Sequence, residues 1–231
     1  KIKMKSNWNS HLKYFIYEKS TIHARLKDGL KSFQGFVYGQ NKEVTEVLEN
    51  GIKFHVDIIN SQKTGLFLDM REMRKLVGEL SKDKTVLNCF SYTGGFSLYA
   101  MKGGKKKVDS VDIAPEAIEL AKKNFEINNI DASQSKFLTL DVFRFLRDDP
   151  LKYDFIILDP PAFAKKKEDI ESARRGYGEI NRTTLLKMPS NSFLLTCSCS
   201  YHVSWELFEE IIARAAIDSK RKVRILHKHR L

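Results

Sequence analysis

The chain has 231 residues, of which 42% are hydrophobic and 30% are charged, and its formal net charge is +11. This length allows one large domain, or one domain with a smaller module, and the composition is that of a globular protein. The chain has 3 cysteines, too few for a disulfide framework or a zinc ligand set, and no apolar stretch approaches the roughly 20 residues that span a bilayer.

These properties predict a cytosolic protein with no signal sequence, no metal and no membrane partner. The excess of basic residues favours a polyanionic partner, nucleic acid above all, although the same charge also suits a solvated surface. The charge is concentrated in Lys102–Lys107 and in Lys165-Lys166-Lys167. The second group matters more, because it directly follows a distinctive acidic turn.

Residues 1–60 contain aromatic residues, short apolar runs and several turn signals. Asn50-Gly51 lies between the apolar runs Val44–Leu48 and Ile52–Val56, which is a strong β-hairpin signal. The sequence therefore predicts a short N-terminal helix and a small β-rich hairpin domain over residues 1–60, followed by a second domain over residues 61–231.

From about residue 69, predicted strands and helices alternate. The predicted strands are Thr85–Cys89, Lys107–Val111, Lys136–Thr139, Phe155–Leu158, Phe193–Thr196 and Lys222–Leu226. The predicted helices are Asp69–Leu80 with Asp69 as N-cap, Gly95–Met101, Pro115–Asn128, Val142–Arg147, Ile180–Lys187 and Ser204–Ala216. This order predicts an α/β fold with a parallel, doubly wound sheet, in which ligands bind beyond the carboxyl ends of the strands.

Three successive strands end in glycine-rich or acidic turns. The first turn, Asn88–Gly95, lacks the dinucleotide spacing and the P-loop lysine. The second strand ends at Asp112, which suits ribose hydroxyls, and the third at Asp141, which suits an exocyclic amine. One aspartate alone is more often a helix N-cap, but three turns in register are harder to explain by capping. The series resembles the S-adenosylmethionine site of class I methyltransferases with their Rossmann-like sheet.

The strand Phe155–Leu158 ends in Asp159-Pro160-Pro161, whose prolines stiffen the turn. Amino-group methyltransferases use a similar turn, with an aromatic residue directly after the two prolines. Here Ala162 holds that place and Phe163 follows. The turn indicates a methyltransferase without indicating which atom is methylated.

Two cysteines, Cys197 and Cys199, follow the strand Phe193–Thr196. A thiolate that adds to C6 of a pyrimidine makes C5 nucleophilic enough to attack a sulfonium methyl group. If the strand continues, its alternation places both thiols on the same side. The competing interpretation is that both are small buried hydrophobic residues, which is also the expectation for Cys89.

Four segments together resemble the rRNA large-subunit methyltransferase I family, and they are Gln62–Arg71, Asn88–Ser97, Asp159–Lys165 and Cys197–Ser200. The resemblance covers about residue 14 to the end. It implies that the chain uses S-adenosylmethionine to form 5-methylcytosine in large-subunit ribosomal RNA, with S-adenosylhomocysteine as product. It also implies a PUA domain, a central β-rich hairpin domain and a Rossmann-like catalytic domain. The chain is expected to begin after the PUA domain and to stop before the family's last strands.

The resemblance places the nucleophile on Cys199. Cys197 is the alternative, because Thr196-Cys197-Ser198 matches the Thr-Cys-Ser motif of other RNA cytosine-5 methyltransferases. Asp159 is expected at the N3/N4 edge of the cytosine. The cofactor-binding residues implied by the turns and the resemblance are Thr64, Phe67, Asp69, Arg71, Asn88, Phe90, Ser91, Tyr92, Thr93, Gly94, Gly95, Asp112, Ile113, Asp141, Val142, Phe143, Asp159 and Pro160.

Two other functions stay open. Methylation of a base amine or ring nitrogen would need the Asp-Pro-Pro turn and no thiol. A non-catalytic RNA-binding assembly module would explain the charge and the β-rich start, although Gly94, Gly95, Asp112 and Asp141 argue against it. Large-subunit rRNA is the expected partner, and a homodimer is left open.

Overall fold

The computed structural model describes residues 16–19, 34–38, 44–57, 65–104 and 107–230. The chain forms two compact units, Lys1–Val47 with His55–Leu66, and Leu48–Phe54 with Phe67–Leu231. The predicted N-terminal helix lies outside the described residues. Within the described ranges, no helix has the length and apolar character needed to cross a membrane.

Short antiparallel strands form the described N-terminal part. β1 (Ile16–Lys19) pairs with β2 (Gln34–Tyr38), and β3 (Val44–Glu49) pairs with β4 (Ile52–Asp57). The turn residues Asn50 and Gly51 both have positive φ, 50° and 77°, as a two-residue type I′ hairpin turn requires. The predicted hairpin is confirmed, and its tip, Leu48–Phe54, belongs to the second unit.

The second unit contains a five-stranded parallel sheet in the order β7-β6-β5-β8-β9. Its strands are β5 (Thr85–Cys89), β6 (Lys107–Asp112), β7 (Phe137–Thr139), β8 (Phe155–Leu158) and β9 (Phe193–Thr196). The predicted parallel, doubly wound sheet is confirmed. The strand order reverses between β5 and β8, and ligands of open α/β sheets bind at such a switch point.

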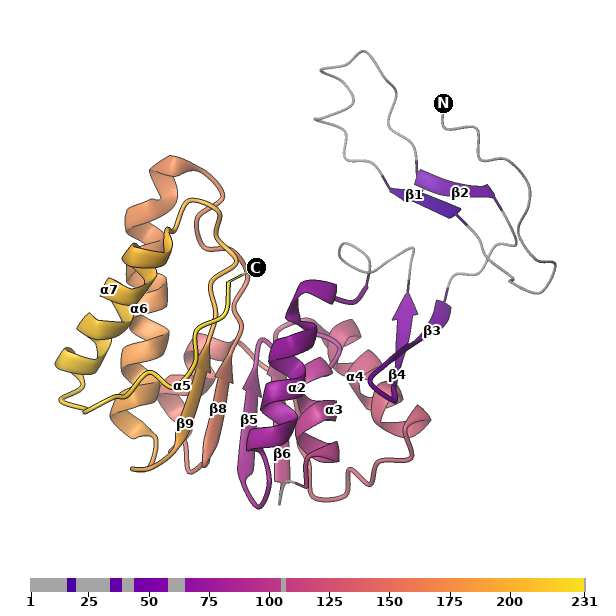
Figure 1. Cartoon of the computed structure of the whole chain (residues 1–231), viewed down its shortest axis with the longest axis horizontal. Helices are drawn as coiled ribbons and strands as arrows, with labels where there is room; N and C mark the ends of the chain where they lie inside the picture. The colour runs from indigo at the N-terminus through magenta and orange to yellow at the C-terminus, as the bar shows by residue number, and fades with distance from the viewer. Residues whose placement is uncertain (1–15, 20–33, 39–43, 58–64, 105–106, 231) are drawn as a thin grey trace, which may run out of the picture. The chain divides into compact units, whose positions relative to one another are not determined.

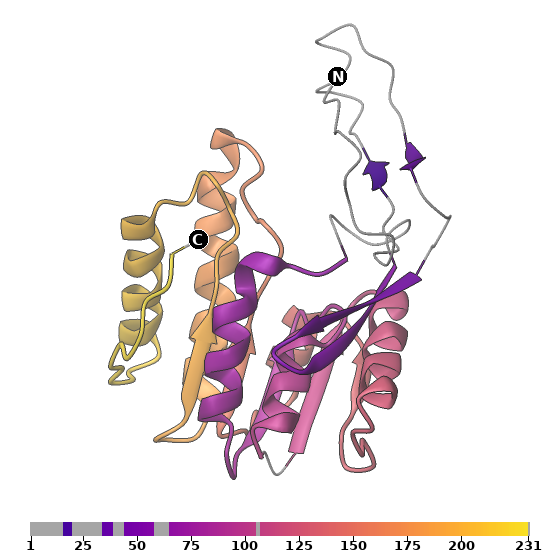
Figure 2. The ribbon, with the colours of Figure 1, turned by 45° about the vertical axis from the view of Figure 1, so that its right-hand side comes forward.

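Helices cover both faces of this sheet. They are η1 (Leu68–Met70), α2 (Arg71–Leu80), α3 (Gly95–Lys102), α4 (Pro115–Ile127), α5 (Val142–Asp148), η2 (Lys167–Asp169), α6 (Ile170–Lys187) and α7 (Trp205–Asp218). α2 and α3 pack on one face and α4 contacts α3, whereas α5, α6 and α7 cover the other face (Figure 1). Figure 2 shows α6 and α7 side by side.

Each face of the sheet has its own hydrophobic core. In β8, Phe155 and Ile157 belong to the core under α2 and α3, and Ile156 and Leu158 belong to the core under α5, α6 and α7. Successive side chains of a strand point to opposite faces, so a strand buried on both faces is an unbroken apolar run. This double burial anchors the strand ends that carry the site residues.

Two predictions about helix starts were wrong. α6 begins at Ile170 rather than Ile180. Its first turns are hard to recognise from the sequence, because they bury only Ala173 and Tyr177 and are otherwise polar. Asp69 does not cap α2: it lies within the 3₁₀ turn η1, and Met70 occupies the N-cap position without a side-chain hydrogen bond.

The predicted strand Lys222–Leu226 was also wrong, because residues 221–230 contain no strand. Val223 and Leu226 are more than half exposed. Alternating apolar residues are a local signal, and they do not show whether a neighbouring strand is present. A strand needs such a neighbour to complete its backbone hydrogen bonds. The segment contacts α7 through side chains instead, since Lys228 pairs with Glu209 and its ammonium lies over the Trp205 ring.

Candidate active site

The carboxylate of Asp112 holds the glycine-rich turn after β5. Asp112 accepts hydrogen bonds from Tyr92 N at 2.8 Å and from Ala114 N at 3.0 Å. Ser91 N donates to Val111 O at 3.0 Å, which ties the same turn to β6. The ends of β5 and β6 are therefore held together. Asp112 lies against the glycine-rich turn, as expected for neighbouring parallel strands.

The turn has an unusual backbone. Phe90 and Tyr92 have φ of 57° and 46°, in the left-handed region that non-glycine residues seldom adopt. Gly94 has φ of 79°, and a Cβ there would lie 3.0 Å from Ala121 Cβ of α4. Such backbone strain clusters at functional sites, where the surrounding structure holds it in place.

Three polar atoms at this turn are buried and have no hydrogen-bond partner within the described part of the chain. They are Asn88 Oδ1, Ser91 Oγ and Tyr92 Oη. The amide nitrogen of Asn88 does have a partner, Ser97 Oγ at 2.9 Å. A buried polar atom without a partner costs free energy. The turn is therefore suited to a polar ligand that contacts these atoms.

The end of β7 differs from the end of β6. Asp141 is exposed and caps α5, accepting a hydrogen bond from Arg144 N at 2.8 Å. Val142 is 2% exposed and packs in the core, whereas Phe143 is partly buried edge-on to Phe90 at 6.4 Å between ring centroids. Beside Asp112, the apolar side chain of Ile113 is 67% exposed. Ile113 is thus accessible to a ligand, and the Val142 side chain has a packing role.

The segment before α2 contributes only some of its predicted residues. Thr64 lies outside the described residues. The Phe67 ring meets Tyr92 of the glycine-rich turn edge-on, with ring centroids 5.5 Å apart. Arg71 is exposed and donates to Asn50 Oδ1 at 3.5 Å, at the hairpin tip. Phe67 therefore packs against the glycine-rich turn, and Arg71 contacts the hairpin tip.

Arg74, which was not among the predicted site residues, connects these parts. Arg74 is buried and makes two hydrogen bonds to the Glu49 carboxylate, at 2.8 and 2.6 Å. It also donates to Phe67 O at 2.8 Å, and a Cβ on Gly95 would lie 3.1 Å from Arg74 Cδ. The available signal was a basic residue within an apolar helical stripe, formed by Met70, Met73 and Val77.

Asp159 lies half-buried at the end of β8. Burial raises the pKa of its carboxyl to about 6, and the nearby Asp69 carboxylate acts in the same direction. The Arg74 guanidinium and a hydrogen bond from Cys197 act against this rise in pKa. Asp159 therefore exchanges its proton close to neutral pH.

The Asp-Pro-Pro segment and the Cys-Ser-Cys-Ser segment run side by side. Cys197 N donates to Leu158 O at 2.9 Å, and the thiol of Cys199 donates to Pro160 O at 3.3 Å. Further along, Ala164 N donates to Ser200 Oγ at 3.1 Å. The structure thus brings the acidic turn and the thiol together just beyond the carboxyl ends of the paired strands β8 and β9.

The two cysteines occupy different environments, because β9 ends at Thr196 and strand alternation does not continue. Cys197 is partly buried, and burial together with the neighbouring Asp159 raises the pKa of its thiol well above the usual value. Cys199 is exposed. Cys89 is fully buried, and burial raises the pKa of its thiol strongly. Cys199 is therefore the accessible thiol of the three.

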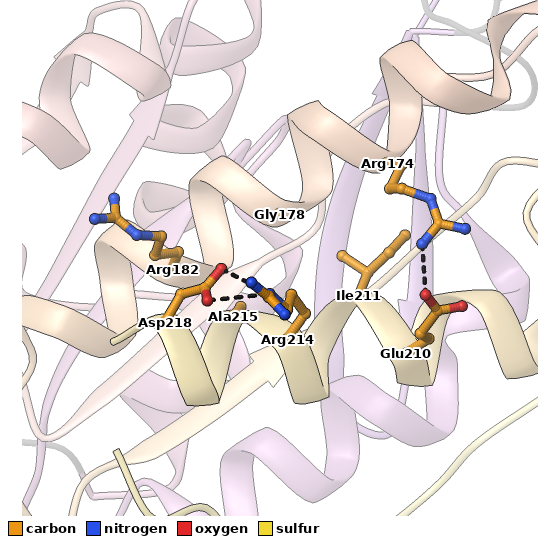
Figure 3. Close-up of a pocket in the computed structure, with 8 residues that line it drawn as sticks. All are labelled: Arg174, Gly178, Arg182, Glu210, Ile211, Arg214, Ala215 and Asp218. Atoms are coloured by element: carbon orange, nitrogen blue, oxygen red, sulfur yellow. Dashed lines mark hydrogen bonds and ion pairs between the residues drawn. The ribbon is translucent and has the colours of Figure 1, made fainter. Parts of the chain in front are cut away.

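A groove between α6 and α7 lies outside this site (Figure 3). Arg174 of α6 pairs with Glu210 of α7 at 2.7 Å, and Arg214 pairs with Asp218 at 3.0 Å. These ion pairs offset much of the positive charge of the groove. Among the residues the structure describes, no cluster of three or more His, Cys, Asp or Glu side chains could hold a metal ion.

One family model matches residues 23–227 of the chain, and it describes S-adenosylmethionine-dependent methyltransferases. The chain belongs to this family. Its cofactor is accordingly S-adenosylmethionine, as the resemblance implied.

Curated relatives of this methyltransferase carry the name of the family that the sequence motifs resemble. Ribosomal RNA large subunit methyltransferase I of Aliivibrio fischeri is 45% identical over 217 residues, which are 92% of this chain and 55% of that protein. The protein of the same name from Pseudoalteromonas translucida is 44% identical over 218 residues, again 92% of this chain and 55% of its own. The chain thus spans about half the length of the curated relatives it matches.

A solved structure shares this fold. A protein assigned as a methyltransferase and crystallised with S-adenosylhomocysteine matches with a TM-score of 0.71 and 33% identity, over 79% of this chain and 49% of its own.

The residues of the glycine-rich turn fit the cofactor of the family. A nucleoside carries hydroxyls and an amine that can serve the three unpartnered buried atoms at the turn. Each oxygen of Asp112 accepts one backbone N–H, and a carboxylate oxygen has room for a second donor such as a ribose hydroxyl.

Proposed function

We propose that this methyltransferase acts on C5 of cytosine in large-subunit ribosomal RNA, through a covalent bond between Cys199 and C6 of the base. The observation that carries this proposal is the contact of the exposed Cys199 thiol with Pro160 O, directly beside Asp159. The name of the curated relatives supports ribosomal RNA as the substrate. The net charge of +11 supports an RNA partner.

A thiol is needed because C5 of cytosine is a weak nucleophile. Addition of the Cys199 thiolate to C6 shifts the ring electrons, so that C5 can attack an electrophile. When bound, S-adenosylmethionine supplies the methyl group as that electrophile. A base then removes the proton from C5, and the Cys199 thiolate leaves C6 as the ring double bond returns.

Asp159 is proposed to bind the N3/N4 edge of the cytosine. Addition at C6 increases electron density at N3, and a hydrogen bond or proton at N3 stabilises the adduct. A neutral carboxyl can donate to N3 and accept from the N4 amine at the same time. A pKa of about 6 keeps this protonated form accessible near neutral pH.

The remaining predicted residues are proposed to hold the cofactor. Asp112 accepts from the ribose hydroxyls, Ile113 and Phe67 supply apolar contact, and Asp141 lies at the next strand end. The backbone and polar side chains of the glycine-rich turn complete the site, through Asn88, Phe90, Ser91, Tyr92, Thr93, Gly94 and Gly95.

The decisive experiment incubates the chain with unmodified large-subunit rRNA and labelled S-adenosylmethionine, followed by mass analysis of the nucleosides. We expect 5-methylcytosine from the wild type and from Cys197→Ala, and none from Cys199→Ala, with cofactor affinity unchanged in both variants. RNA carrying 5-fluorocytosine at the target should trap a covalent complex with the wild type, because fluorine at C5 prevents the final deprotonation.

Each contrary outcome points to a different function. An N-methylated base would support the nitrogen-methylating alternative, for which the Asp-Pro-Pro turn suffices. Activity that survives in Cys199→Ala and disappears in Cys197→Ala would move the nucleophile to Cys197. A chain that binds no S-adenosylmethionine in calorimetry would instead be a non-catalytic RNA-binding module.

A further inference from the structure

The two segments that meet at Cys199 stay in contact beyond the thiol. Ser200, the next residue, accepts a hydrogen bond from Ala164 N at 3.1 Å and shares another with the buried Tyr177 hydroxyl at 2.9 Å. Tyr201 follows on one segment and Lys165 on the other. The residues just past the candidate nucleophile are therefore held in place by buried contacts.

Tyr201 is a large aromatic side chain that the fold leaves in solvent. It lies in a turn closed by the hydrogen bond from Val203 N to Ser200 O at 3.0 Å, and it is 93% exposed. Its ring meets the His202 ring edge-on, with centroids 5.3 Å apart. Because nearly all of the side chain is exposed, ring surface is open to a flat partner.

The segment across from Tyr201 is strongly basic. Lys165, Lys166 and Lys167 are all exposed. The Asp169 carboxylate accepts hydrogen bonds from Lys165 N at 3.1 Å and Lys166 N at 2.9 Å, which orders this part of the backbone. An ordered row of cations close to an exposed aromatic ring is the combination by which proteins bind single-stranded nucleic acid.

We propose that Tyr201 stacks on a base that flanks the target cytosine, while Lys165, Lys166 and Lys167 contact the neighbouring phosphates. This inference rests on the proposed RNA substrate and adds how the strand is held at the site. With Cys199 only two residues from Tyr201, a nucleotide in reaction with the thiol leaves its neighbour within reach of the ring. An acidic protein partner would use the lysines but would have no base to place on Tyr201.

The test measures the binding of labelled single-stranded oligoribonucleotides by fluorescence anisotropy, with S-adenosylhomocysteine present so that no methylation occurs. One probe carries a cytosine between two purines, and the other carries the same cytosine between two abasic sites. Tyr201→Ala should bind the purine probe about 5- to 150-fold more weakly than the wild type, since stacking contributes about 1–3 kcal/mol per base. The abasic probe should bind both proteins equally.

Matched variants separate stacking from other effects. Tyr201→Trp should keep the wild-type affinity, and Leu186→Ala, which removes an exposed apolar side chain on α6, should change nothing. Binding of heparin, a polyanion without bases, should depend on the three lysines and not on Tyr201. Thermal unfolding of each variant checks that the fold is intact.

Two results would overturn the proposal: purine-probe affinity of Tyr201→Ala within twofold of the wild type, or an equal loss on both probes. The proposed function is judged separately, by whether the wild type forms 5-methylcytosine. Tyr201-dependent binding without methylation would reject the reaction and keep the stacking site.

Discussion

Asp159 shows how burial sets the protonation state of one group at the candidate active site. The carboxyl follows β8 and lies near the Asp69 carboxylate, and both its burial and this neighbouring charge disfavour its ionised form. Its pKa of about 6 compares with 3.8 for an unperturbed aspartate. The folded protein therefore binds more protons than the unfolded chain between these two values, and the free energy of unfolding falls as the pH rises across this window.

We therefore expect Asp159→Asn to unfold at a higher temperature than the wild type at pH 8, because asparagine removes a charge that is costly to bury. Near pH 4 the difference should vanish, since the folded wild-type carboxyl is protonated there. Thermal unfolding at the two pH values checks this, and an equal shift at both would contradict it.

The same substitution should reduce the methyl-transfer rate by about 10²–10⁴, since an amide cannot give a proton to N3. Single-turnover rates measured from pH 5 to pH 9 should show a wild-type limb near pH 6 that is missing in Asp159→Asn. A limb that persists in the variant would assign this titration to another group.

At the scale of elements, the tip of the β3–β4 hairpin is tied to three helices. Glu49 binds Arg74 of α2 and accepts a hydrogen bond from the Tyr99 hydroxyl of α3 at 2.9 Å. Just past α4, Asn128 Nδ2 donates to Lys53 O at 2.7 Å, and Asn128 Oδ1 accepts from Lys53 N at 2.9 Å. The tip is thus part of the structure that positions the glycine-rich turn and Asp159.

The Glu49–Arg74 pair is buried, with side chains 6% and 4% exposed. Removing one partner leaves an unpaired buried charge, so Arg74→Met and Glu49→Gln should each cost about 3–5 kcal/mol of stability. The double variant should cost less than the sum of the two. Urea unfolding of all four proteins measures this coupling, and strict additivity would contradict it.

Arg74 also lowers the pKa of Asp159, so the pH limb of the double variant should move above its wild-type position near pH 6. A pair with a purely structural role would leave the limb in place while the stability changes. Tyr99→Phe, which removes a neighbouring hydrogen bond without removing a charge, is the matched control for both measurements.

The bounds of some elements could be predicted from the local sequence, whereas several contacts between elements could not. β5, β8 and β9 have the predicted bounds, because each is a short, largely apolar run between polar turns. The cysteine segment lies beside the Asp159 segment because β8 and β9 are adjacent parallel strands that end at one edge of the sheet. The Glu49–Arg74 pair was missed, since its partners are 25 residues apart and meet only when the hairpin tip docks. The exposure of Tyr201 could not be predicted, because it depends on the hydrogen bonds that hold its turn in the folded protein.

At the scale of the whole molecule, the net charge of +11 favours a polyanion, but the salt dependence of the proposed RNA binding is set by how many of these charges contact phosphates. Each phosphate contact releases condensed counterions, so affinity falls with salt in proportion to the number of contacts. Only lysines that touch the strand contribute to this slope, whereas distant lysines act weakly through a screened field.

We expect Lys165→Ala/Lys166→Ala/Lys167→Ala to reduce the slope of log affinity against log salt by about 2, from about 0.7 for each single-strand phosphate contact. A triple variant with the same net charge, Lys82→Ala/Lys123→Ala/Lys152→Ala, removes exposed lysines elsewhere and should keep the wild-type slope. Equal slopes for the two triple variants would show that total charge, and not its placement, governs binding.

The hairpin tip also decides how this protein can be dissected. Residues Leu48–Phe54 belong to the unit that contains the sheet, although Val47 before them and His55 after them belong to the other unit. A fragment that starts at Phe67 would carry every strand of the sheet but would leave the Arg74 guanidinium buried without its carboxylate. Such a fragment should be recovered mainly as insoluble protein, whereas one that starts at Val44 keeps Glu49 and is the shortest sensible candidate for expression.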